Sequence, residues 1–258
     1  PKEIIDKSIQ LDFLSYNIKK KGWLRHYNFL SYGLHLKNLF DNKGRLNLLF
    51  TSLYKNQYST NTKKMAYHTY SSKNLFVDGI RDLNDREEIL SQIKFKKGEK
   101  VLDIGSNIGL LAHYLEKRGC KVNGYELDLK ACVCSKIINN IDSHNIDFSQ
   151  IDLDKEKSII HFDTTFLFSV IHHTKYLAEN GKKISKSSDR IIIECRLKED
   201  GKKPVTINNE IIWETSSSWN FNNTDQLHIY LEKLFPFHKV FKNHGKCDKS
   251  RFIIELKK

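Results

Sequence analysis

Two acidic residues and two glycines have the types and spacing of a ligand-binding turn. Residues 101–109 have the sequence VLDIGSNIG, and Glu126 follows Gly105 by 21 residues, at the end of the next apolar stretch. A carboxylate at the place of Glu126 accepts hydrogen bonds from both ribose hydroxyls, and Asp103 is placed to hold a cationic amino group. The pattern therefore predicts a binding site for a nucleoside at a junction of strand, turn and helix.

Two common phosphate-binding motifs do not fit this turn. A G-x-G-x-x-G dinucleotide site that starts at Gly105 needs glycine at positions 107 and 110, where Asn107 and Leu110 stand. No Gly-Lys-Ser/Thr follows the turn, so a Walker loop is excluded as well. The turn disfavours NAD and FAD and favours a ligand without phosphates, such as S-adenosylmethionine.

Strands and helices alternate on both sides of the turn. Strands are predicted at 100–104, 121–126, 146–151, 162–170, 190–194, 239–242 and 252–256. Helices are predicted at 85–93, 108–118, 130–141 and 224–234. This alternation predicts an α/β fold, a doubly wound and mostly parallel seven-stranded sheet with helices on both faces. The last two strands are too close for a crossover helix, so the last strand is expected to be antiparallel.

The charge is uneven along the 258 residues. Residues 1–65 carry 12 Lys and Arg against 4 Asp and Glu, which is +8 of the net +12 of the whole chain. We expect a basic helical N-terminal extension over 1–65 and a Rossmann-like domain over 66–258. The surplus charge favours an anionic partner such as RNA, a nucleotide-linked molecule or an acidic membrane surface. A general abundance of lysine explains it equally well.

Composition also limits the compartment and the metal chemistry. The apolar stretches are far shorter than the roughly 20 residues that cross a bilayer, and the start of the chain has no secretory pattern. The five cysteines form no CxxC pair and no zinc spacing. We therefore expect a cytoplasmic protein with no membrane span and no metal site.

Known sequence motifs add a family resemblance to this interpretation. VLDIGSNIG resembles motif I of class I S-adenosylmethionine-dependent methyltransferases, and YELD at 125–128 resembles their acidic second-strand end. Asn107 stands where the commoner motif has glycine, as in related bacterial methyltransferases. Segments 76–90 and 245–258 resemble a bacterial group with cell-envelope polysaccharide and tRNA-modifying relatives. The resemblance covers about residues 74–258 and implies S-adenosylmethionine as the cofactor.

The resemblance also implies which residues bind this cofactor. Asp152 is expected to accept the adenine amino group, with Asp147 and Asp154 as rivals. The full predicted set is Asp103, Gly105, Ser106, Asn107, Gly109, Glu126, Asp152 and Ser169.

The acceptor side is expected where the fourth and fifth strands end. His172 or His173 is the predicted general base, because an imidazole with a pKa near 6.5 takes a proton at neutral pH, and Glu194 could orient it. The alternative for each histidine is a core position. His68, Tyr70 and Arg81 are expected at the cofactor mouth, where Arg81 either anchors an anionic acceptor or pairs with a nearby aspartate. Residues 205–221, with Trp213 and Trp219, could form a lid.

These residues predict an enzyme that methylates oxygen on a small or glycan-linked acceptor, with or without phosphate, and so a role in polysaccharide biosynthesis. The alternative is a tRNA or rRNA methyltransferase that grips RNA with residues 1–65. No NPPY-type tetrapeptide follows the fourth strand, which ends in FSVIHH, so amino N-methylation of a base is disfavoured. A binding module without chemistry is a third reading. The sequence predicts no oligomeric state.

Overall fold

The computed structural model describes residues 46–47, 66–77, 79–170, 173–202, 205–207, 210–212, 224–247 and 251–258. The chain divides into two compact units, one of Pro1–Asp82 with Val133–Asn145 and one of Leu83–Cys132 with Ile146–Lys258. The predicted helical extension over 1–65 lies outside the described residues, except for the short strand β1 (Leu46–Asn47). No helix in the described part is long and apolar enough to cross a membrane.

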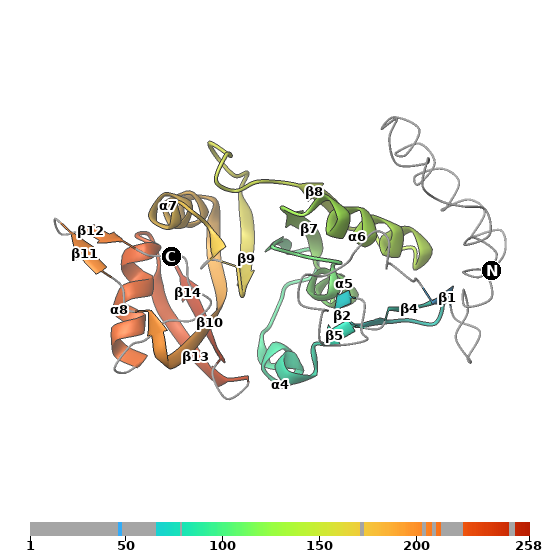
Figure 1. Ribbon diagram of the computed structural model, residues 1–258, viewed down its shortest axis with the longest axis horizontal. Coiled ribbons are helices and arrows are strands. Elements are labelled where there is room, and N and C mark those ends of the chain that lie inside the picture. The colour runs from blue at the N-terminus through green and yellow to red at the C-terminus, as the bar shows by residue number, and fades with distance from the viewer. Residues whose placement is uncertain are drawn as a thin grey trace. The chain divides into compact units, whose positions relative to one another are not determined.

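The second unit is built on a seven-stranded sheet in the order β13-β14-β10-β9-β6-β7-β8 (Figure 1). Its strands are β6 (Lys100–Ile104), β7 (Lys121–Glu126), β8 (Asp147–Gln150), β9 (Phe162–Phe168), β10 (Ser188–Lys202), β13 (Lys239–Lys246) and β14 (Arg251–Lys257). All neighbouring pairs are parallel except those of β14, which runs antiparallel to both β10 and β13. The predicted mixed sheet with an antiparallel last strand is confirmed.

Helices cover both faces of this sheet, because its strands are apolar on both sides. Along β6, Val101 belongs to one buried cluster and Leu102 to the other, as expected for a parallel strand without a solvated face. Helices α7 (Leu177–Ser187) and α8 (Thr224–Leu234) pack in the cluster of Leu102. Helices α4 (Asn84–Gln92) and α5 (Leu110–Lys117) pack in the cluster of Val101.

The order of the strands places a ligand site at one point of the sheet. β6 and β9 are neighbours although β7 and β8 lie between them in sequence, so the winding direction reverses there. In open α/β sheets ligands bind outside the carboxyl ends of the strands at this reversal. A ligand site is therefore expected at the turn after β6 and the segment after β9.

Some elements differ from the prediction. Helix α7 was not predicted, because Leu177 and Ile184 are the only large apolar residues among its buried positions. It packs closely instead: a Cβ on Gly181 would lie 2.5 Å from the backbone oxygen of Leu234. β10 is longer than the predicted 190–194, and the predicted lid region holds a short hairpin of β11 (Val205–Ile207) and β12 (Glu210–Ile212). Trp213 and Trp219 lie outside the described residues.

The first unit contains short strands and most of helix α6 (Leu129–Ile141). β2 (Ala66–His68) pairs with β5 (Gly79–Arg81), and β4 (Leu75–Val77) pairs with β1 and β3 (Tyr70–Ser71). The Asp142 carboxylate accepts hydrogen bonds from Tyr70 Oη at 2.5 Å, from Ser72 Oγ at 3.0 Å and from Asn74 Nδ2 at 3.0 Å. A single carboxylate thus ties this strand region to the end of α6.

Candidate functional site

The turn after β6 has a left-handed backbone at three positions, which are occupied by glycine and asparagine. Gly105, Asn107 and Gly109 have φ values of 74°, 52° and 85°. Asparagine tolerates this left-handed region better than most side chains, which explains why Asn107 replaces a glycine here. The N–H groups of Gly105 and Ser106 both donate to the Tyr125 carbonyl, at 2.7 and 3.1 Å, which fixes the turn to β7.

Glu126 holds the same turn from the end of β7. Its Oε2 accepts the N–H of Asn107 at 2.7 Å, and its Oε1 accepts the N–H of Asp128 at 2.8 Å. Burial raises the pKa of Glu126, and these backbone hydrogen bonds act against the rise. Each carboxylate oxygen has a second lone pair, so the carboxylate can also accept hydrogen bonds from a ligand.

Asp103 is buried at the carboxyl end of β6, with 2% of the residue exposed. The N–H of Ala112 in α5 bonds to its carboxylate, but Oδ2 has no hydrogen-bond partner among the described residues. Burial and, second, the charge of Glu126 raise the pKa of Asp103 to about 7. A buried carboxylate oxygen without a partner is costly, so this site is built to receive a hydrogen-bond donor or a cation.

On the other side of the sheet reversal, β9 ends at Phe168 and is followed by Ser169, whose backbone is also left-handed, with a φ of 56°. The Ser169 hydroxyl donates to Glu194 Oε1. Glu194 in β10 is fully buried and paired with Arg86 of α4, through both Nε and Nη2, and with Arg251 Nε at 3.3 Å. Burial opposes ionisation, but Arg86, Ser169 and Arg251 hold the pKa of Glu194 below its usual range.

The predicted role of Glu194 was to orient an imidazole, but its described partners are two guanidinium groups, a hydroxyl and the Cys247 thiol at 3.9 Å. His172 lies outside the described residues. The N–H of His173 donates to the Val170 carbonyl at 2.8 Å, and its side chain is exposed on one side. Partial desolvation lowers the pKa of His173, so its imidazole is neutral at pH 7.

The three aspartates proposed for adenine differ in their contacts. Asp154 accepts hydrogen bonds from the N–H groups of Lys175 and Tyr176 and from Asn180 Nδ2, so it caps α7. Asp152 pairs with Lys155 Nζ at 2.8 Å, and this hydrogen bond lowers its pKa. Asp147 accepts Asn123 Nδ2 at 3.2 Å. Asp154 is thus occupied by the helix, while Asp152 remains the predicted adenine ligand.

His68, Tyr70 and Arg81 lie in the first unit. Tyr70 is buried and bonds to Asp142, and the Arg81 guanidinium lies 5.4 Å from the centroid of the Tyr67 ring. The His68 ring lies 4.8 Å from that of Tyr67. Their contact with an acceptor stays a prediction.

Comparison with solved structures identifies the fold of this chain. No protein-family model matches the sequence, and no curated protein does. Solved structures match well: an S-adenosylmethionine-dependent methyltransferase from Mesorhizobium loti has 11% identity, covers 68% of this chain and 98% of its own, and has a TM-score of 0.52. One from Aquifex aeolicus has 17% identity, covers 67% and 89%, and has a TM-score of 0.51.

The N-terminal domain of EvdMO1, determined in the presence of S-adenosylhomocysteine and D-fucose, has 13% identity, covers 73% of this chain and 88% of its own, and has a TM-score of 0.54. The chain has the class I methyltransferase fold. The strand order and this similarity confirm the predicted doubly wound architecture. The narrower bacterial group stays a prediction.

The residues at the turn fit the cofactor that this fold implies. Asp103 Oδ2 is a buried acceptor without a partner in the described part, which suits the ammonium of S-adenosylmethionine. Glu126 has lone pairs for the ribose hydroxyls. Gly105 lies under Val170, because the Val170 side chain fills the place where a Cβ on Gly105 would be. A larger residue than glycine therefore does not fit at the turn.

Sequence reasoning missed Arg86 and Arg251, the two partners of Glu194. Arg86 stands in the charged run NDREE, which resembles a solvated helix face. Its spacing to Ile89, Leu90 and Ile93 nevertheless follows one helical face, and all three are buried. That spacing was the available sign that Arg86 points inward and needs a buried acid.

Proposed function

We propose that this chain is an S-adenosylmethionine-dependent methyltransferase that methylates a hydroxyl oxygen of a small or glycan-linked acceptor. The observation that carries the proposal is the buried Asp103 oxygen without a described partner, next to Glu126 at the carboxyl end of β6. This pair matches the two ends of the donor, a cationic amino acid and a ribose. Its position at the carboxyl end of β6, beside the reversal of strand order, supports the proposal.

The residues of the chain have separate tasks in this proposal. Asp103 binds the ammonium group and Glu126 the ribose, and together they orient the donor against the turn. S-adenosylmethionine supplies a methyl group that its sulfonium has already activated for displacement. The protein therefore mainly aligns the acceptor oxygen and removes its proton.

His173, with His172, is proposed as the group that takes this proton. The pKa of His173 lies below its ordinary value because the ring is partly desolvated, so the imidazole is neutral and able to accept a proton at pH 7. The proton passes from the acceptor hydroxyl to an imidazole nitrogen as the new C–O bond forms and the C–S bond breaks. Solvent can then accept it, because His173 is exposed on one side.

A sugar or glycan hydroxyl is the proposed acceptor class. The EvdMO1 domain, of the same fold, was studied in the presence of D-fucose together with the donor product. A phosphate on the acceptor agrees with the net charge of +12. A glycan-linked acceptor would place the enzyme in polysaccharide biosynthesis.

Calorimetry with S-adenosylhomocysteine tests the donor site. Asp103→Ala and Glu126→Ala are each expected to weaken binding at least tenfold, because each loses a charge-assisted hydrogen bond of about 1.5–3 kcal/mol. Asp163→Ala is the control, since Asp163 is exposed and accepts only the Lys100 N–H among its hydrogen bonds described. Wild-type affinity in both site variants would refute the donor site.

Product release tests the chemistry. Wild type and His173→Ala are incubated with S-adenosylmethionine and a panel of sugars and sugar phosphates, and S-adenosylhomocysteine is quantified. His173→Ala is expected to lower turnover while S-adenosylhomocysteine affinity stays unchanged. If His173→Ala and His172→Ala both keep the turnover of wild type, histidine has no part in the mechanism.

RNA methylation is the second candidate, and the basic composition of residues 1–65 favours it. Those residues lie outside the described part, apart from 46–47. RNA binding would weaken with salt by about 0.7 log units per log of salt for each phosphate contacted on a single strand. Methylation of tRNA with such a slope, and none of sugars, would select this candidate.

A further inference from the structure

We propose that Glu194 and Asp154 are positioning residues that fix the two ends of the strand-end segment, of which residues 169–170 and 173–176 are described, and thereby the place of His173. The importance of His173 rests on the proposed function, but the anchoring can be measured without a substrate. The segment follows Phe168, the last residue of β9, and finishes at Tyr176, just before α7 begins. Residues 171 and 172 within it lie outside the described part.

Glu194 anchors the beginning of the segment through Ser169. The left-handed backbone of Ser169 is unfavourable for an L-residue with a side chain, so it persists only when the surroundings hold it. The hydrogen bond from Ser169 Oγ to Glu194 Oε1 is the contact that holds it. The direction in which the chain leaves β9 is therefore set by the place of one carboxylate.

That carboxylate is itself immobile. Glu194 is completely buried, and Arg86 from α4 and Arg251 from β14 pair with it from two different elements. The Arg86 guanidinium also lies 5.9 Å from the centroid of the Phe168 ring, at the last position of β9. A buried charge with two fixed counter-charges has no alternative position, which makes Glu194 a rigid reference point.

Asp154 anchors the other end of the segment. Its two carboxylate oxygens accept the N–H groups of Lys175 and Tyr176 at 3.0 and 3.2 Å and Asn180 Nδ2 at 2.6 Å. The loop that carries Asp154 is in turn pinned to α7, because Lys183 Nζ donates to the carbonyls of Leu153 and Glu156, both at 2.7 Å. Asp154 therefore holds the end of the segment, and the Lys183 hydrogen bonds hold the loop of Asp154 against α7.

Between the two anchors the segment touches the donor turn. The Val170 side chain packs on Gly105, and the Val170 carbonyl accepts the N–H of His173 at 2.8 Å. His173 is therefore joined to the donor turn by one residue and one hydrogen bond. Fixing both ends keeps this short connection in one arrangement, which methyl transfer needs because misplacement of a reacting group by about 1 Å can lower a rate about a hundredfold.

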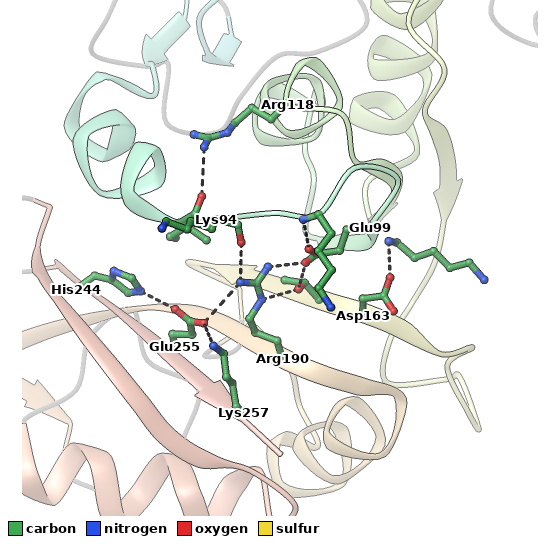
Figure 2. Close-up of polar contacts among 12 residues, drawn as sticks. Lys94, Glu99, Arg118, Asp163, Arg190, His244, Glu255 and Lys257 are labelled. Carbon is green, nitrogen blue, oxygen red and sulfur yellow. Dashed lines mark hydrogen bonds and ion pairs between the residues drawn. The ribbon is translucent and has the colours of Figure 1, made fainter.

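Glu255 in β14 offers a matched control. It is buried like Glu194 and contacts basic side chains: His244 Nε2 at 2.9 Å, Lys257 Nζ at 3.2 Å and Arg190 Nη1 at 3.6 Å. Figure 2 shows this second ion network, in which Arg190 also donates to Glu99 and to the Lys94 carbonyl. Arg190 lies opposite Thr164, near the start of β9, whereas Glu194 lies opposite Phe168 at its end.

The experiment compares local amide exchange in Glu194→Gln, Ser169→Gly and Asp154→Asn with that in Glu255→Gln. Ser169→Gly is informative because it removes the anchoring hydrogen bond without straining the backbone, since glycine adopts a φ of 56° readily. Hydrogen exchange by mass spectrometry is expected to be at least tenfold faster over residues 169–170 and 173–176 in the first three variants. In Glu255→Gln exchange over these residues should match wild type.

The His173 imidazole gives a second readout that a purely structural role would not move. In a histidine-labelled NMR titration its pKa should rise toward the ordinary value in the three anchor variants, because a loosened segment lets water reach the ring. Glu255→Gln should leave the titration unchanged.

Wild-type exchange and an unshifted His173 titration in folded Ser169→Gly and Asp154→Asn would overturn the proposal. Equal acceleration in Glu255→Gln would overturn it as well, since general loosening would then explain the result. If Glu194→Gln does not fold, the results for Ser169→Gly and Asp154→Asn test the proposal. Lost turnover or donor binding in His173→Ala or Asp103→Ala bears only on the proposed function, because the anchoring is measured without donor or acceptor.

Discussion

Asp103→Asn is expected to make the protein without ligand more stable at neutral and alkaline pH. Asp103 is buried, and its pKa is raised from 3.8 to about 7, first by burial and then by the charge of Glu126. Asparagine keeps the shape of the side chain and carries no charge. The substitution therefore removes an ionisation that the folded state resists.

The direction and size of the effect follow from proton linkage. Between pH 3.8 and about 7 the folded protein keeps a proton on Asp103 that the unfolded chain has lost, so the free energy of unfolding falls as pH rises through this window. The loss is complete above the folded-state pKa. At about 1.4 kcal/mol per pH unit, the whole shift corresponds to about 4 kcal/mol, and the part between about pH 5 and pH 8.5 to about 3 kcal/mol.

Urea unfolding of wild type and Asp103→Asn, without donor, measures this difference at pH 5 to 8.5. The free energy of unfolding of Asp103→Asn minus that of wild type should grow by about 3 kcal/mol over the range, roughly 10 °C in Tm for a domain of this size. Asp163→Asn, at an exposed aspartate, is the control for the substitution itself. A difference for Asp103→Asn that does not change with pH would refute the buried ionisation.

Three further results are expected. Wild-type affinity for S-adenosylhomocysteine should fall up to tenfold per pH unit below about 7, as Asp103 takes up its proton, and calorimetry of Asp103→Asn should show weaker binding without this slope. In urea titrations, Gly109→Ala should lower the free energy of unfolding by about 1–3 kcal/mol more than Gly119→Ala. Both glycines have a positive φ, but only a Cβ on Gly109 would collide with a ring, 2.5 Å from Phe148 Cζ. Asp142→Ala should speed amide exchange in residues 70–77, measured by mass spectrometry, because three side-chain donors lose their acceptor; exchange no faster than in Asp147→Ala would contradict this.

The parts of the fold that the sequence predicts well are those whose pattern is local. β6 and β7 have their predicted bounds: each begins at a lysine, β6 ends just before Gly105, and β7 ends at Glu126. Helix α8 also has its predicted bounds: Leu227, Tyr230, Leu231 and Leu234 repeat at helical spacing and are all buried. Helix α7 lacks such a pattern and depends on the Asp154 cap and on close packing at Gly181.

In the candidate site, too, residues close in sequence can be predicted, and contacts between distant residues cannot. Asp103, the glycines and Glu126 lie within about 25 residues of one another, and their spacing alone predicts a common turn. The partners of Glu194 cannot be found by spacing, because Arg86 precedes it by 108 residues and Arg251 follows from the last strand. Pairs of this kind are created by the order of the strands, so the sequence alone does not indicate the two arginines.

The two buried carboxylates at the carboxyl edge of the sheet show how surroundings assign a task to one chemical group. Asp103 has an oxygen without a partner in the described part and a raised pKa, so its ionised form is unfavourable until a cation arrives. Glu194 has two guanidinium partners and a lowered pKa, so its ionised form is already satisfied. A further cation would gain little at Glu194 and much at Asp103. The donor ammonium is therefore expected at Asp103, and Glu194 is left to hold the chain in place.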